Sequence, residues 1–145
     1  MILRTIFRMA WVVTALVIAA LVALAVLLAL GGVWVGDELK AAAPHDPALK
    51  HGAPVFGMVL FASTVTPALT ALPALVAVVA GEVLRVRSWM YYVLAGGAAL
   101  AVVPLLAAPD GADLTEIATS PYMTIFATAG FAGGFIYWLL AGARA

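Results

Sequence analysis

The stretch MAWVVTALVIAALVALAVLLALGGVWV, from Met9 to Val35, is the most informative part of this chain. It contains no charged residue, and Thr14 carries its only hydroxyl group. About 20 apolar residues in a helix are enough to cross the ~30 Å hydrocarbon core of a bilayer. The stretch therefore predicts a transmembrane helix, and lipid becomes the solvent against which the remaining sequence is interpreted.

The composition of the whole chain agrees with a lipid environment. Of the 145 residues, 66% are hydrophobic and 10% are charged, whereas a soluble domain has about 25% charged residues. The absence of cysteine excludes disulfides, thiolate nucleophiles and cysteine-based metal sites. The formal net charge of zero offers no basic surface to nucleic acid. We expect a single membrane domain over residues 1–145, with the lipid bilayer as its partner and no nucleic-acid partner.

Four apolar segments are long enough to span a bilayer. Because lipid cannot satisfy backbone N–H and C=O groups, each segment must be helical. The sequence thus predicts an all-α fold, an integral membrane bundle of four transmembrane helices. A cleaved signal peptide is the alternative for the first segment, but signal hydrophobic regions run only about 7–15 residues. The four predicted spans cover residues 9–35, 54–80, 89–107 and 121–141.

Polar connections separate these spans. Residues 36–53 and 81–88 are predicted to be a loop and a tight turn. In the acidic connection 108–120, Asp113 and Glu116 have the spacing of a capping pair, which predicts a short helical turn over 114–119. Ser120 before Pro121 predicts the start of the last helix, with a hydroxyl cap and a proline at the first helical position.

The distribution of cations predicts the orientation. With four spans, one side of the membrane receives five arginines and the other receives only two lysines. Since Lys and Arg are retained in the cytoplasm, both termini are predicted to be cytoplasmic. The five are Arg4, Arg8, Arg85, Arg87 and Arg144, and the two are Lys40 and Lys50.

The second span has an unusual content of hydroxyl groups and prolines. Ser63, Thr66 and Thr70 share one helical face, while Pro67 and Pro73 each remove a backbone hydrogen bond. One interpretation is a kinked helix that offers hydroxyls and carbonyls to a ligand, which makes these five residues a candidate binding site facing the bundle interior. The other is that the hydroxyls only satisfy backbone groups freed by the prolines, as is common in membrane helices.

The last span carries a small-residue surface. Gly130 and Gly134 form a Gly-x-x-x-Gly pattern, with Gly133 beside it. Small residues allow membrane helices to approach closely. Gly96 and Gly97 of the third span are the expected facing surface, although the pattern alone also permits packing between chains.

Few residues suggest chemistry. No Asp, Glu, Lys, Arg or His lies well inside a predicted span, which disfavours pumps and proton-coupled transporters. Ser63 has no neighbouring base that would make it a nucleophile. His45, Asp46 and His51 could form a weak metal site, but their spacing does not favour one. We therefore predict no catalytic residue, no metal and no cofactor.

The C-terminal segment Ala129-Gly-Phe-Ala-Gly-Gly-Phe-Ile-Tyr-Trp-Leu-Leu-Ala-Gly-Ala-Arg144 resembles small Ala-rich inner-membrane proteins of proteobacteria that have no assigned role. The resemblance covers mainly the last helix and the four-helix layout. It implies location in a bacterial inner (plasma) membrane and no activity.

Two functions are compatible with these features. The first is a non-enzymatic accessory or structural subunit that acts by helix packing, with other membrane proteins or itself as partners. The second is a small-molecule-binding or oligomeric transport protein that uses the Ser/Thr/Pro-rich second span.

Overall fold

The computed structural model describes residues 2–64 and 67–144, without the side chains of residues 64, 67–71 and 144. The described residues form six α-helices and a short 3-10 helix, and they contain no β-strand. Three helices, α1, α4 and α6, are long and apolar enough to cross a membrane, which indicates a multi-pass membrane protein. The elements are α1 (Ile2–Ala42), α2 (Pro47–Thr64), α3 (Pro67–Val83), α4 (Trp89–Ala107), α5 (Leu114–Thr119), α6 (Pro121–Leu140) and the 3-10 helix η1 (Gly142–Arg144).

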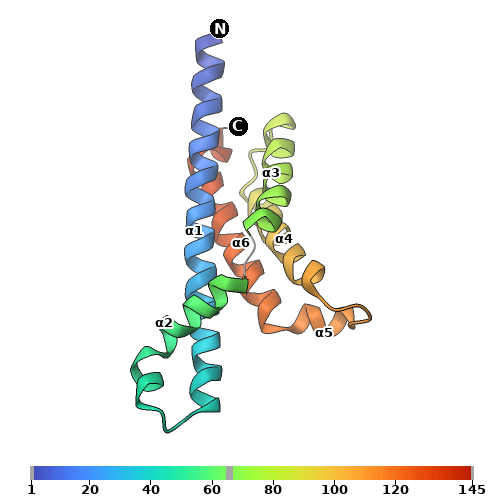
Figure 1. The fold of residues 1–145 in the computed structure, drawn as a ribbon. Helices are drawn as coiled ribbons and strands as arrows, with labels where there is room; N and C mark the ends of the chain where they lie inside the picture. The colour runs from blue at the N-terminus through green and yellow to red at the C-terminus, as the bar shows by residue number, and fades with distance from the viewer. Residues whose placement is uncertain (1, 65–66, 145) are drawn as a thin grey trace.

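The chain passes four times between the two ends of the molecule (Figure 1). It descends along α1, returns through α2 and then α3, descends along α4 and ascends along α6, while the short α5 connects the lower ends of α4 and α6 (Figure 1). The N-terminus, the C-terminus and the connection from α3 to α4 all lie toward the upper end. The main helix pairs are α4 with α6, α1 with α2, α1 with α6, and α3 with α4.

The second predicted span, expected as one kinked helix over 54–80, is described as two helices. Helix α2 ends at Thr64 and α3 begins at Pro67. Residues 65–66, which connect the two helices, lie outside the described residues. Pro73 follows Ala71 and Leu72, which are good helix formers, and it lies inside α3.

Residues 36–53 are mostly helical, so the predicted loop there is wrong. Helix α1 continues to Ala42, because its last turn contains the favourable helix formers Glu38 to Ala42. Asp46 then accepts a hydrogen bond from the backbone N–H of Ala48 at 2.9 Å, and Pro47 occupies the first position of α2. The polar connection is thereby reduced to residues 43–46.

Both helix starts predicted for the acidic connection are confirmed. Asp113 caps α5 by accepting a hydrogen bond from the Thr115 N–H at 2.9 Å. Ser120 caps α6 by accepting a hydrogen bond from the Met123 N–H at 3.3 Å, and Pro121 is the first residue of that helix. These caps position α6 directly after the short α5.

Buried side chains form two clusters. One surrounds Phe61 of α2 and includes Leu27 of α1, Val103 of α4 and Phe126 of α6. The other contains Tyr92 and Tyr137 together with two alanines of α1 and Ala141, which follows α6. The first cluster joins α1, α2, α4 and α6, and the second lies nearer the end of the molecule where both termini are found.

Candidate functional site

Helices α4 and α6 cross at glycines. A Cβ atom on Gly96 would overlap the carbonyl oxygen of Gly130, and it would lie 3.0 Å from the Cα of Gly134. A Cβ atom on Gly134 would in turn lie 2.8 Å from the carbonyl carbon of Tyr92. The two backbones are therefore in direct contact, as small residues permit between membrane helices.

The two remaining predicted packing glycines have different neighbours. Gly97 lies against the ring of Phe131 on α6. Gly133 faces α1, since a Cβ atom placed on it would lie 2.9 Å from the Cβ of Ala23 and 3.2 Å from the carbonyl oxygen of Ala19. Helix α6 is thus held by small residues on two sides, against α4 and against α1.

A second glycine crossing joins α1 and α2, and our sequence analysis did not identify it. A Cβ atom on Gly57 would overlap the carbonyl oxygen of Gly32 and lie 2.7 Å from the nitrogen of Gly36. Gly31 receives the ring of the buried Phe61. Gly32 and Gly36 have the same i, i+4 spacing as Gly130 and Gly134, so this spacing could have revealed them.

A cavity of about 440 Å³ lies among α1, α3, α4 and α6. It exists because α3 packs on α4 and α1 packs on α6, while α1 and α3 pack little against each other. Many of the residues that α1 and α3 present to the space are alanines, and the α4–α6 crossing contributes glycines, so these positions leave part of the space unfilled. Among the lining residues are Ala20 and Ala23 of α1, Ala74 and Ala77 of α3, and Gly96 and Gly130 of the crossing.

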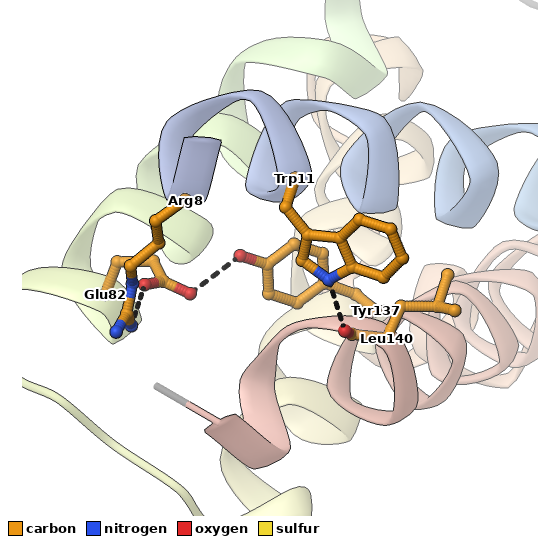
Figure 2. Close-up of polar contacts among 5 residues, drawn as sticks. All are labelled: Arg8, Trp11, Glu82, Tyr137 and Leu140. Carbon is orange, nitrogen blue, oxygen red and sulfur yellow. Dashed lines mark hydrogen bonds and ion pairs between the residues drawn. The ribbon is translucent and has the colours of Figure 1, made fainter. Parts of the chain in front are cut away.

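At one end of the cavity, Glu82 of α3 contacts one residue of α1 and one residue of α6. Its Oε2 atom is 3.0 Å from Nη2 of Arg8, and its Oε1 atom accepts a hydrogen bond from the Tyr137 hydroxyl at 3.0 Å. Figure 2 shows the Glu82 carboxylate between these two partners. Close by, the indole N–H of Trp11 donates a hydrogen bond to the Leu140 carbonyl at 2.8 Å (Figure 2). These contacts join α3 to α1 and α6, and α1 to α6.

The position of Glu82 follows from the end of α3. The N–H of Val86 bonds to the Gly81 carbonyl at 3.0 Å, and Arg85 adopts φ 52°, which together form a Schellman-type helix end. An acidic residue in the last turn is disfavoured by the helix dipole. The ion pair with Arg8 compensates for this, and Glu82 is less exposed than its partner, at 18% against 53% of the side chain.

Tyr92 also lines the cavity at this end. Only 3% of the residue is exposed, and its hydroxyl has no hydrogen-bond partner among the described residues. The adjacent Tyr91 differs, because its hydroxyl donates a hydrogen bond to the Ala77 carbonyl at 3.0 Å. A buried hydroxyl without a partner is uncommon and indicates either a local cost or a missing partner.

Of the predicted ligand-binding residues whose side chains are described, neither Ser63 nor Pro73 lines this cavity. Pro73 is half-buried and precedes the lining residue Ala74. Ser63 is exposed and donates its hydroxyl to the Leu60 carbonyl of its own helix at 2.6 Å. The expected inward orientation of Ser63 is therefore wrong. Thr66 lies outside the described residues, as do the side chains of Pro67 and Thr70.

Comparisons with protein-family models, with curated proteins and with solved structures find no match to this chain. Within residues 2–64 and 67–144, no group of three or more His, Asp or Glu side chains could hold a metal ion. The chemical character of the site therefore rests on the cavity, Glu82 with its partners, and Tyr92.

Proposed function

We propose that this protein crosses a bacterial inner membrane four times, with both termini in the cytoplasm. The three long apolar helices support membrane insertion. The arrangement of the two termini and the α3–α4 connection toward one end supports an even number of crossings, of which α2 and α3 together make the second. The excess of arginine on that end supports its cytoplasmic location.

Within that membrane, we propose that the protein is non-enzymatic and binds an apolar small molecule between α1 and α3. The observation that carries this proposal is the 440 Å³ cavity, which falls within the range of about 300–1,000 Å³ typical of ligand pockets. Apart from Tyr92 and Tyr137, its lining side chains are apolar or absent. Lipid-like molecules are abundant around such a site, and the apolar walls would exclude most polar solutes.

An accessory role through helix packing has weaker support. The glycines of α6 contact α4 and α1 within the chain, and those of α1 contact α2. These surfaces are therefore already occupied and leave no small-residue face on α6 for a partner helix at those positions.

The binding proposal can be tested with molecules that remain bound during purification. Ala20 lines the cavity and is exposed, so phenylalanine there would occupy the space without entering the packed core. Ala25 is an exposed alanine of the same helix that is not part of the lining, and Ala25→Phe is the matched control. Organic extracts of each purified protein would be analysed by mass spectrometry.

We expect wild type and Ala25→Phe to retain an apolar molecule in near-equal amounts. We expect Ala20→Phe to retain at least ~10-fold less, which corresponds to about 1.4 kcal/mol of binding free energy. Equal retention by Ala20→Phe and Ala25→Phe, or no retained molecule in wild type, would contradict the proposal.

A further inference from the structure

We propose that the methyl end of a fatty acyl chain of a membrane phospholipid occupies this cavity, and that the chain enters sideways from the bilayer between α1 and α3. The headgroup of the same lipid stays at the membrane surface. The inference rests on the proposed function, because it names the class of the apolar molecule bound there.

The cavity is open on one side. Val17, Ala20 and Leu24 of α1 line it and are also exposed, and they follow one face of the helix at spacings of three and four residues. Leu75 of α3 likewise lines the cavity and is exposed. The lining therefore runs from an exposed edge on α1 and α3 to a buried surface on α4 and α6. Four buried lining residues form this cavity floor, namely Ala99, Leu100, Gly130 and Gly133.

The opening lies at the depth of lipid chain ends. On α1 the lining extends from Leu16 to Leu27. At ~1.5 Å per residue, it starts about 10 Å from Met9 and stops about 12 Å from Val35, the ends of the proposed span. This places the cavity in the middle of the ~30 Å hydrocarbon core, away from both headgroup layers. The groups most abundant at this depth are the methyl ends of acyl chains.

Water and polar solutes are poor occupants of such a cavity. A buried water molecule needs about two to four polar partners, and the lining side chains offer only two hydroxyls. The Tyr137 hydroxyl is bound to Glu82, and the Tyr92 hydroxyl is fully buried against the last turn of α3. An empty cavity would in turn lose the dispersion contacts of its walls. A hydrocarbon chain restores these contacts and brings in no polar group.

The shape of the cavity favours a chain that remains attached to its lipid. The lining is ~16 Å long on α1, which suits an extended chain better than a compact molecule. Because the cavity opens along its side, the chain can enter while the phosphate stays in the interface, and no charge is buried. Since α1 and α3 pack little against each other, no helix contact has to break at the opening.

Two photoreactive probes would test the inference. One is a phosphatidylcholine with a diazirine near the methyl end of one acyl chain, and the other is the free alkane of the same length with a diazirine at the corresponding carbon. Each would be added at the same mole fraction to phosphatidylcholine nanodiscs that contain the full chain, and labelled residues would be mapped by mass spectrometry. Ala99 reports on the cavity floor. Ala98 is the reference, because it is an exposed alanine at nearly the same depth that does not line the cavity.

We expect the phospholipid probe to label both Ala98 and Ala99 in wild type and in the control Ala25→Phe. In Ala20→Phe the new ring occupies the opening. Labelling of Ala99 relative to Ala98 should then fall roughly 10-fold, which is the loss expected above for a retained molecule.

The possible failures are distinguishable. If the alkane labels Ala99 and the phospholipid probe labels only Ala98, the ligand is a free apolar molecule; the inference is then overturned and the proposed function stands. Equal labelling of Ala99 by the phospholipid probe in Ala20→Phe and Ala25→Phe would overturn the entry between α1 and α3, although the cavity is occupied. If neither probe labels Ala99 in wild type, the proposed function fails, and the inference fails with it.

Discussion

The α4–α6 crossing leads to a quantitative prediction for Gly130→Ala. The added Cβ atom would overlap the Gly96 carbonyl and lie 2.8 Å from the Cα of Gly97, and both obstacles are backbone atoms that cannot rotate away. The helices must therefore separate by about 1 Å to restore ordinary contact. Overpacking of this kind costs about 1–3 kcal/mol, and the higher helix propensity of alanine returns up to about 1 kcal/mol. We expect a net loss of about 1–2 kcal/mol.

The assay is the free energy of unfolding in detergent, measured by titration with a denaturing detergent. Gly52→Ala is the control, because a Cβ atom there would meet only the ring of Phe56, which can turn aside. That variant should be neutral or slightly more stable. The double variant Gly96→Ala/Gly130→Ala should lose less than the sum of the single losses, because one separation of the helices relieves both overlaps. A Gly130→Ala protein as stable as the parent would refute the close crossing.

Three further predictions concern topology and the end of the cavity. Reporters that are active only outside the cytoplasm, fused after Lys50, Glu116 and Arg144, should be active, active and inactive, and an active Arg144 fusion would reverse the proposed orientation. Glu82→Gln should lower the free energy of unfolding by about 0.5–1 kcal/mol, because it removes the ion pair with Arg8 of α1. This loss of stability should be smaller in high salt, and a loss that does not depend on salt would argue against the ion pair. Arg85→Gly should raise the free energy of unfolding by about 1 kcal/mol, measured by thermal unfolding, because a φ of 52° is unfavourable for arginine and not for glycine. A variant less stable than the parent would contradict this explanation.

Local rules were sufficient for much of the fold. The apolar stretches predicted α1, α4 and α6, since length and hydropathy are properties of each segment alone. The caps at Asp113 and Ser120 were predicted for the same reason, because each depends only on residues within one helical turn. The second span was expected as one kinked helix, and the structure describes α2 and α3 on either side of residues 65–66.

The candidate site was less accessible from the sequence. Ser63 was expected to face the bundle interior, but its hydroxyl is satisfied by its own helix, so it needs no neighbour. Arg8 and Glu82 are separated by 74 residues, and no local pattern connects them. The cavity itself depends on how far α1 and α3 lie from each other, which is a consequence of the packing of both helices on α4 and α6.

The central claim is that a ligand occupies the space between α1 and α3. The most direct test is an experimental structure of the protein in lipid nanodiscs, at a resolution that shows side chains. The account predicts continuous non-protein density that extends past Ala20 and Ala77. Direct packing of α3 on α1, with the cavity closed and no such density, would contradict it.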